Sequence, residues 1–435
     1  SSLKYLNISK ICRPIDDASL VRGLLSLVHL ETLVINDSPF QGTGERCLPS
    51  NLFRLTKLRH LYLNNYRYDE AELGSSLLKL TQLESLSLGR QGVRNDLLPI
   101  AQLTQLRYLN LESSKITEMA FCEQLGKLTQ LHFLSFRGAH LNDSEFDKLV
   151  PELAKLTCLT HLDLSQNGLQ NPTALVDALK GMYALTYLNL GDNCFDHLAL
   201  QTLSQVPLPS LRFFSLKSNP FGQKNVSSTE IALKRLGWEG DEALSIWLGS
   251  MPELTHLDLT DCSLTTCDLF ALSHALSRLP RLQKLFVTSP SVEYLVDRCG
   301  VLEVVDSIRH LTQLVHLKLC LGLTDAEGCV LSQSLSQCIF LQHLLLKSNR
   351  LGPDTGSHFA QTLKKLTRLR TLDLSSNGLG DEGVKATFPA LLKLVSRLTL
   401  SLGGNDMSQK TYKVMNRLLP HLPMSIRLPN EDVYD

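Results

Sequence analysis

The sequence predicts an α/β fold: a curved, horseshoe-shaped solenoid of about 15 strand–helix units, with a parallel β-sheet on its concave face. Three observations lead to this prediction. A short leucine pattern recurs along the 435 residues, an asparagine often follows it at a fixed distance, and a segment with helical periodicity separates one copy from the next. A regular internal repeat favours one stacked array over several separate globular domains.

The leucine pattern is L-x-x-L-x-L, as in the segment L-T-H-L-D-L that begins at Leu159. Because side chains alternate along a strand, Leu162 and Leu164 should point into the core. His161 and Asp163 should then point to the concave side. Most copies start 23 to 28 residues apart, and the exceptions are spacings of 43 and 32 residues after the ninth and eleventh copies. The copies begin at Leu3, Leu30, Leu58, Leu83, Leu106, Leu131, Leu159, Leu185, Leu211, Leu254, Leu282, Leu314, Leu341, Leu369 and Val395.

An asparagine often stands eight residues after the start of a copy. Its side-chain amide can bond backbone groups of the adjacent turn, so we expect it to join successive units into a ladder. Cys262 takes this position in its own copy. The ladder asparagines are Asn167, Asn193, Asn219, Asn349 and Asn377. Looser turns are expected where the position is occupied by Ser114, Ala139 and Gly322.

A helix is predicted between the turn of one copy and the strand of the next. Phe146, Leu149, Val150 and Leu153 recur at helical spacing, and Ser144 is the expected N-cap. A second stripe of this kind consists of Leu269, Leu272, Ala275, Leu276 and Leu279. Since helices are wider than strands, a stack of such units must bend with its strands on the inside.

The segment Leu369–Gly383, L-R-T-L-D-L-S-S-N-G-L-G-D-E-G, resembles the ribonuclease-inhibitor-like class of leucine-rich repeats. That class includes the ribonuclease inhibitor, the GTPase-activating protein of Ran, the C-terminal domains of NOD-like receptors and repeat effectors of bacterial pathogens. The resemblance covers the whole chain. It implies a leucine-rich-repeat solenoid, and it identifies the architecture far more narrowly than the function.

Within this architecture we expect the solenoid to span residues 1–404, with an irregular long repeat at 211–253. Residues 405–435 should form a C-terminal capping helix and a polar tail, because Pro420, Pro423 and Pro429 end regular structure. The first residues already lie inside a repeat, so we expect the chain to be part of a longer protein.

The composition argues against several classes of function. Lys and Arg total 43, and Asp and Glu also total 43, so the chain lacks the basic excess typical of nucleic-acid-binding proteins. No apolar run approaches the roughly 20 residues that cross a bilayer, which predicts no membrane insertion. The 11 cysteines are odd in number and scattered. They favour reduced thiols and a cytoplasmic protein, in a host cytosol if it is a secreted effector.

Signatures of catalysis are also missing from the sequence. It contains no H-E-x-x-H zinc motif, no phosphate-binding G-x-x-x-x-G-K-[ST] loop, no G-x-S-x-G nucleophile motif and no dinucleotide-binding fingerprint. The tightest cysteine groups do not share a structural layer, so no metal site follows from them. We therefore expect a protein that is not an enzyme and that needs neither a metal nor a cofactor.

The third residue of each copy points to the concave face, and ten of these 15 residues are aromatic or His. Exposed aromatic side chains are typical of protein interfaces, whereas a solvated strand face carries mainly Thr, Ser, Lys and Glu. The alternative is that neighbouring rings stack only to stabilise the sheet. The predicted partner-binding residues in this column are Tyr108, Phe133, His161, Tyr187, Phe213 and His256.

Two further features accompany this column. The fifth residues of the same copies form a polar strip suited to orienting hydrogen bonds: Asn110, Ser135, Asp163, Asn189 and Ser215. The long copy after Leu211 carries an insertion at 219–240 with Trp238, which we include among the partner-binding candidates because insertions in repeat arrays often lie at a binding face. The alternative is a surface loop without a binding role.

These observations predict a module that binds a protein partner on its concave face, either as the sensing domain of a larger receptor or as a host-targeting bacterial effector. The main alternative is a GTPase-activating repeat protein that acts on a small GTPase through one arginine. No local motif singles out such an arginine.

Overall fold

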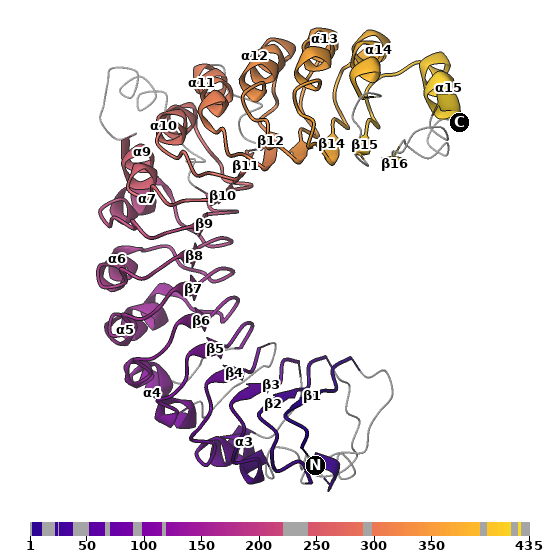
Figure 1. Ribbon diagram of the computed structural model, residues 1–435. Coiled ribbons are helices and arrows are strands. Elements are labelled where there is room, and N and C mark those ends of the chain that lie inside the picture. The colour runs from indigo at the N-terminus through magenta and orange to yellow at the C-terminus, as the bar shows by residue number, and fades with distance from the viewer. Residues whose placement is uncertain are drawn as a thin grey trace. The chain divides into compact units, whose positions relative to one another are not determined.

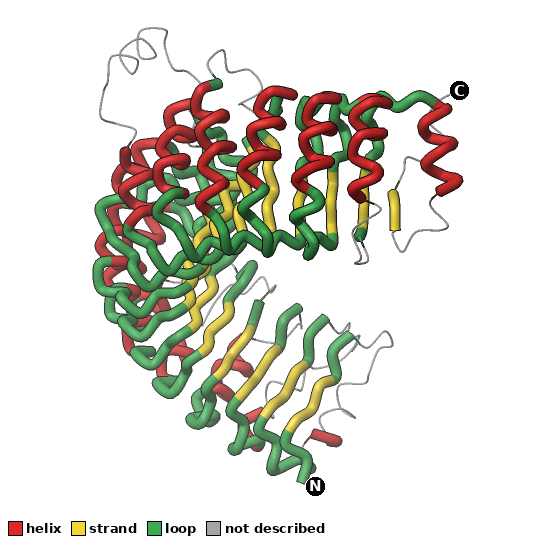
Figure 2. The backbone as a smooth tube through the Cα atoms, turned by 45° about the horizontal axis from the view of Figure 1, so that its top comes forward, coloured by secondary structure: helices red, strands yellow, loops and turns green. Residues whose placement is uncertain are grey.

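The computed structural model describes residues 2–10, 22–24, 26–37, 52–65, 70–89, 98–114, 119–220, 242–289, 298–391, 398–418 and 425–427. The chain forms two compact units, Ser1–Phe195 and Asp196–Asp435. In each unit parallel strands follow one another in chain order along the inner side, and helices cover the outer side (Figures 1 and 2). The predicted α/β repeat solenoid is therefore confirmed in both units.

The first unit contains eight described strands, which pair in parallel and in register. Tyr108 lies opposite Phe133, and Phe133 lies opposite His161, so the third residues of successive copies form one continuous column. The strands are β1 (Tyr5–Asn7), β2 (Thr32–Val34), β3 (His60–Tyr62), β4 (Ser85–Ser87), β5 (Tyr108–Asn110), β6 (Phe133–Ser135), β7 (His161–Asp163) and β8 (Tyr187–Asn189). The helices are α3 (Glu70–Leu77), α4 (Met119–Cys122), α5 (Asp143–Leu153) and α6 (Thr173–Leu179), with 3-10 helices at Leu52–Arg54, Leu98–Gln102 and Leu125–Lys127.

The second unit repeats this arrangement with longer helices. Its strands are β9 (Phe213–Ser215), β10 (His256–Leu259), β11 (Lys284–Thr288), β12 (His316–Cys320), β13 (His343–Leu345), β14 (Thr371–Asp373), β15 (Thr399–Ser401) and β16 (Ser425–Arg427). Its helices are α7 (His197–Leu203), α9 (Glu242–Gly249), α10 (Thr266–Leu276), α11 (Cys299–Ser307), α12 (Asp325–Leu335), α13 (Pro353–Thr362), α14 (Gly380–Leu391) and α15 (Gln409–Leu418), with a 3-10 helix at Ile308–His310.

The core lies between the sheet and the helices of each unit. Leu162 of β7 and Leu164, which directly follows this strand, are 0% exposed, as the leucine pattern predicts. The helical stripes are also confirmed, because their members are buried in α5 and α10, with Leu279 buried just after the end of α10. Burial of such Leu side chains contributes about 1.5–3 kcal/mol each relative to exposure, so the pattern that defines the repeat also supplies its main stabilisation.

The N-cap prediction for α5 is wrong. The helix starts at Asp143, and its N-cap is Asn142 rather than Ser144. The Oδ1 atom of Asn142 accepts a hydrogen bond from the Glu145 nitrogen at 3.0 Å, and the Glu145 carboxylate accepts one from the Asn142 nitrogen at 3.0 Å. This reciprocal pair satisfies two helix-end donors, and Ser144 already lies inside the first turn of the helix.

A buried asparagine joins one repeat to the repeat before it. The Nδ2 atom of Asn377 donates to the backbone oxygens of Leu346 (3.0 Å), in the preceding copy, and Leu374 (3.0 Å). Its Oδ1 atom accepts from the nitrogen of Leu351, also in the preceding copy, at 3.2 Å. The ladder is thus confirmed, and the same cross-repeat contacts are made by Asn167, Asn193, Asn349 and Asn405.

The last leucine copy starts two residues later than predicted. The prediction began this copy at Val395 and put Arg397 in the third-position column, and both residues lie outside the described part of the chain. Strand pairing instead places Thr399 in the column, opposite its counterpart in β14. The segment L-V-S-R-L-T-L-S-L allows two overlapping matches to the leucine spacing, and only the later one puts Asn405 at the ladder position.

The C-terminal segment also differs from the expectation. Strand β16 pairs in parallel with β15, although prolines at 420, 423 and 429 were expected to end regular structure there. The strand is three residues long and contains no proline, so each of its residues keeps a backbone N–H for pairing.

We predict that Asn377→Ala destabilises the second unit by about 2–4 kcal/mol, because the substitution leaves several buried backbone groups without their hydrogen bonds. Urea unfolding followed by circular dichroism measures this loss. Gln361→Ala, on the exposed side of α13, is the control and should change the stability by less than about 0.5 kcal/mol. Equal effects of the two substitutions would contradict the stabilising role of the buried asparagines.

Candidate functional site: the strand face of the first unit

Four rings from four successive strands stack on the strand face of the first unit, which is the side of its sheet opposite the helices. The ring centroids of Tyr108 and Phe133 are 4.1 Å apart, and those of Phe133 and His161 are also 4.1 Å apart. The His161 and Tyr187 centroids are 3.7 Å apart, and their planes differ by 9°. We call Tyr108, Phe133, His161 and Tyr187 the ring ladder.

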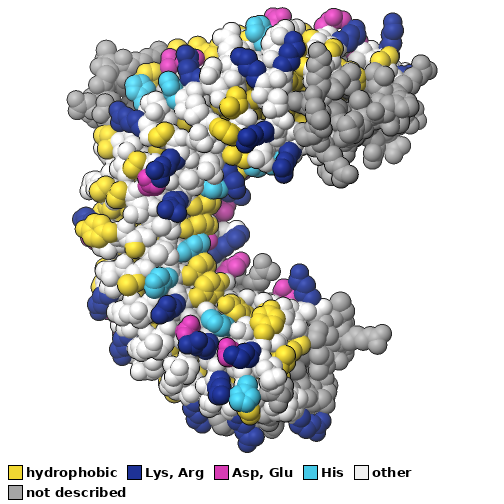
Figure 3. Space-filling model, viewed as in Figure 1, with side chains coloured by type: hydrophobic (Ala, Val, Ile, Leu, Met, Phe, Trp, Pro, Cys, Tyr) yellow, Lys and Arg dark blue, Asp and Glu magenta, His cyan; other side chains and the backbone are white. Residues whose placement is uncertain are grey.

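The ring ladder follows directly from the strand register. Neighbouring parallel strands lie about 4.8 Å apart, close to the spacing at which planar rings make contact, so one ring per strand produces a continuous stack. All four side chains stay partly exposed. Hydrophobic (yellow) and His (cyan) side chains accordingly line the strand-bearing edge of this unit (Figure 3).

Burial within the stack changes the acid–base behaviour of two of its members. Loss of contact with water lowers the pKa of His161 to about 4, and the nearby Asp163 carboxylate opposes this only in part. Burial also raises the pKa of Tyr108. At neutral pH the ring ladder is therefore uncharged, which suits it to contact apolar or aromatic groups.

The polar side chains beside the ring ladder largely make hydrogen bonds within the protein. Asp163 is 8% exposed, and its Oδ1 atom accepts hydrogen bonds from the nitrogen (2.9 Å) and the hydroxyl (2.6 Å) of Ser165. The Nδ2 atom of Asn189 donates to Asp163 Oδ2 at 3.2 Å, and its Oδ1 atom accepts from the Gly191 nitrogen at 3.1 Å. These residues hold the turns that follow the strands, and the rings are left as the more accessible groups.

The structure adds one ring that the sequence analysis did not select. Tyr62, the fifth residue of its copy, contacts Tyr108 edge to face with centroids 6.1 Å apart. The strand between them carries Ser85 and Ser87, which are small and buried, so the two rings can meet across it. Tyr62 is not in the third-position column, so that column alone could not reveal it. The small residues on the neighbouring strand are the sequence signal that could have done so.

The remaining predicted partner-binding residues belong to the second unit. Phe213 and His256 are neighbours on β9 and β10, with ring centroids 6.1 Å apart and planes tilted by 37°. Trp238 lies outside the described residues. The other tryptophan, Trp247, is 0% exposed and donates from Nε1 to the Val206 backbone oxygen at 2.9 Å, so it is a core residue.

Three buried cysteine thiols in the described part of the chain have a raised pKa. Burial raises the pKa of Cys122 to about 11 and that of Cys338 to about 12, and it also raises the pKa of Cys262. These thiols stay protonated at neutral pH and behave as small apolar side chains. Among the described residues, no cluster of three or more His, Cys, Asp or Glu side chains could hold a metal ion.

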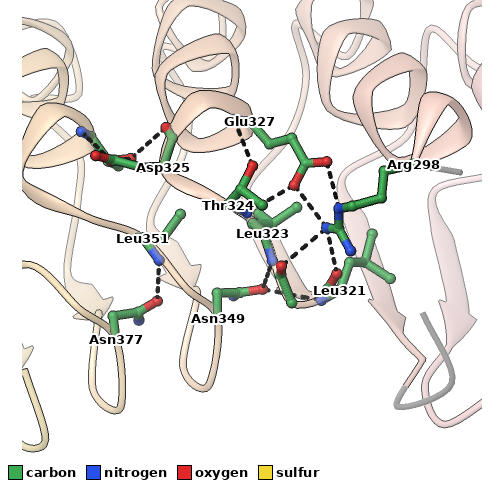
Figure 4. Close-up of polar contacts among 11 residues, drawn as sticks. Arg298, Leu321, Leu323, Thr324, Asp325, Glu327, Asn349, Leu351 and Asn377 are labelled. Carbon is green, nitrogen blue, oxygen red and sulfur yellow. Dashed lines mark hydrogen bonds and ion pairs between the residues drawn. The ribbon is translucent and has the colours of Figure 1, made fainter. Parts of the chain in front are cut away.

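Arg298 illustrates how an arginine can be committed to structure. Its Nε and Nη2 atoms donate to the Glu327 carboxylate at 2.9 and 2.8 Å, and Nη2 also donates to the Leu321 and Gly322 oxygens at 3.2 and 3.0 Å (Figure 4). Gly322 stands at the ladder position of its copy, where a looser turn was expected. Arg298 binds this turn, so it is not a candidate for the catalytic arginine of the GTPase-activating alternative.

We predict that the first unit loses stability as the pH falls from about 6.5 to about 4. Folding lowers the pKa of His161 from 6.5 to about 4, so below pH 6.5 the unfolded chain binds a proton that the folded chain does not. Allowing for solvent screening, this contribution amounts to about 1–2 kcal/mol. Thermal unfolding of wild type and His161→Phe across this pH range measures it.

The phenylalanine variant should keep the ring stack and lose less stability on acidification than the wild type. His132→Phe, which replaces an exposed histidine of the same unit, should behave like the wild type. Identical pH dependence of all three proteins would show that His161 does not resist protonation.

Two family models match the chain. One, described as a leucine-rich repeat region, matches residues 1–293, and the other, described as a leucine-rich repeat, matches residues 365–386. Among curated proteins, a putative late blight resistance protein homolog from Solanum demissum is 35% identical over 86 residues. That match covers 20% of this chain and 10% of the length of the plant protein.

Two solved structures share the fold. An internalin from Listeria monocytogenes superposes with a TM-score of 0.52 and 17% identity, covering 95% of this chain and 96% of the internalin. A leucine-rich-repeat protein from Leptospira interrogans superposes with a TM-score of 0.51 and 19% identity, covering 96% of this chain and 100% of that protein. In the described residues, no helix has the length and apolar character needed to cross a membrane. Because a leucine-rich-repeat model matches more than half of its residues, the chain belongs to the leucine-rich-repeat family.

Proposed function

We propose that the chain is a protein-recognition module whose first unit binds a partner protein through the ring ladder. One observation carries this proposal: four uncharged rings form a continuous, partly exposed stack on a sheet face that no described helix covers. Aromatic side chains dominate the energetically important residues of protein interfaces, because each contributes a large contact area with few rotamers to fix.

The rigidity of the stack favours binding. Each ring is held between neighbours, so little side-chain entropy remains to be lost when a partner docks. A protein surface with an aromatic, aliphatic or cationic side chain could contact the ring edges, and the polar strip beside them is already satisfied internally. The partner class that fits is therefore a protein with an apolar or aromatic contact surface.

The alternative, in which the rings only stabilise the sheet, has support in the same geometry. Aromatic pairs contribute about 0.5–1.5 kcal/mol each beyond the area that they bury. Three stacked pairs thus stabilise the sheet whether or not a partner binds. The two functions are compatible, and they are separated only when affinity and stability are measured on the same variants.

The match to a putative late blight resistance protein homolog supports a sensing domain within a larger receptor over a bacterial effector. We also propose that the protein works in a reducing compartment such as the cytoplasm, since buried cysteines replace apolar or ladder residues in the repeats. The alternative role as a GTPase-activating protein predicts that the chain accelerates GTP hydrolysis by a small GTPase, which a turnover assay measures.

We predict that alanine substitution in the ring ladder weakens partner binding. Tyr108→Ala, Phe133→Ala or Tyr187→Ala should reduce affinity by roughly 30-fold or more for at least one residue, which corresponds to the about 2 kcal/mol typical of interface hot spots. A partner captured from extract with the wild-type protein would be identified, purified and titrated calorimetrically against each variant.

Tyr183→Ala is the matched control, because Tyr183 is a 74% exposed tyrosine of the same unit outside its strands. It should leave the affinity unchanged. The ladder variants should remain folded, whereas a core truncation such as Leu162→Ala should cost about 2–5 kcal/mol of stability. Lower melting temperatures with unchanged affinity would mean that the rings serve the sheet alone.

A further inference from the structure

Three lysines form a diagonal row on the strand face of the second unit. Lys284 is the third residue of its copy, on β11, Lys318 is the fifth residue on β12, and Lys347 is the seventh residue, just after β13. Strand register places each lysine one strand across and two residues along from the one before it. With strands about 4.8 Å apart and about 6.6 Å per two residues, successive positions are about 8 Å apart. We call these residues the lysine diagonal.

Carboxylates are absent from the outward positions of these three strands. Asp258 and Asp373 occupy the fifth positions of the flanking strands, where they lie opposite Phe286 and Leu345. Both are used locally: Asp258 accepts from the Thr260 nitrogen at 2.9 Å, and Asp373 is bonded to the turn that follows β14. In the described part of the second unit, no ion pair involves a member of the lysine diagonal.

Two histidines, His316 and His343, lie beside the lysine diagonal. His316 packs edge to face on Phe286 with centroids 4.8 Å apart, and its centroid is 4.9 Å from that of His343. Burial is the largest of the causes that lower the pKa of His316 to about 4, and the charges of His343, Lys284 and Lys318 contribute to the same lowering. The ammonium groups of Lys284 and Lys318 therefore both act on His316.

We propose that the strand face of the second unit binds an extended, acidic polypeptide segment along the lysine diagonal. Alternate side chains of an extended strand lie on the same face, about 6.6–7 Å apart. Carboxylates at alternating positions therefore match the diagonal spacing of about 8 Å closely enough for flexible lysines to reach them. Phe286 and Leu345 lie on either side of Lys318 in the fifth-position row and offer apolar contact to the intervening residues.

Unpaired surface charges favour such a partner for a physical reason. Among the described residues the lysines make no ion pair that an acidic partner must break, so the complementary charges of partner and surface add to one another. The net charge of the whole chain is zero, but charge complementarity acts locally. Lys and Arg side chains (dark blue) are visible at the strand-bearing edge of this unit (Figure 3).

The test uses a labelled synthetic peptide with Glu at three alternating positions, and the same peptide with Gln in their place. Fluorescence anisotropy with the full chain at low and physiological salt measures binding. The Glu peptide should bind, the Gln peptide should bind at least about tenfold more weakly, and added salt should weaken only the former. Lys318→Glu should reduce affinity for the Glu peptide by about tenfold or more.

Lys365→Glu is the matched control, because Lys365 is an exposed lysine of the same unit that follows α13, away from the strand face. It should leave the affinity within about twofold of wild type, since distant surface charges are screened. Lys318→Gln keeps most of the aliphatic stem, and its melting temperature shows whether loss of binding reflects loss of charge or of fold.

Three outcomes would overturn the proposal: no binding of the Glu peptide at low salt, equal effects of Lys318→Glu and Lys365→Glu, or tighter, Lys318-dependent binding of a single-stranded oligonucleotide of equal charge. The last would assign the surface to nucleic acid. None of these results involves the ring ladder, so this proposal and the proposed function fail or succeed separately.

Discussion

In-register parallel pairing of short strands is the constraint on which the structure depends. It places equivalent residues of successive repeats one strand spacing apart, so a preference at one position of the repeat becomes a continuous row in space. The inward rows consist mainly of leucine and form the core. A row of buried asparagines bonds each repeat to the repeat before it: Asn167, Asn193, Asn349, Asn377 and Asn405. The outward rows are not part of the leucine core, and in our proposal they contact partners.

Those outward rows differ in chemistry between the two units. In the first unit four successive members of the third-position row are rings, and they stack because the strand spacing is close to the distance at which planar rings make contact. In the second unit the same row contains one lysine and three histidines, and three lysines run diagonally across the rows. One scaffold therefore presents an uncharged, rigid surface in one unit and a basic surface in the other, which suits two contacts of different character.

The fold could be predicted almost completely from the sequence, because the leucine spacing determines both the strand direction and the core side. The errors arose where two local signals compete: a second leucine match displaced the last copy toward Val395, and Ser144 looked like an N-cap although Asn142 and Glu145 make the capping box. The ring ladder was visible in a single column. Tyr62 and the lysine diagonal were not, since they involve different positions of neighbouring repeats, and only the strand register brings them together.

The central claim is that partners bind to the strand faces and not to the helices. Hydroxyl-radical footprinting of a complex with a purified protein partner tests it most directly, because aromatic side chains are labelled according to their exposure. Binding should protect Tyr108, Phe133 and Tyr187 from oxidation and leave Tyr183 and the exposed Phe270 of α10 as reactive as in the free protein. Protection of Phe270 with an unchanged ring ladder would contradict the account.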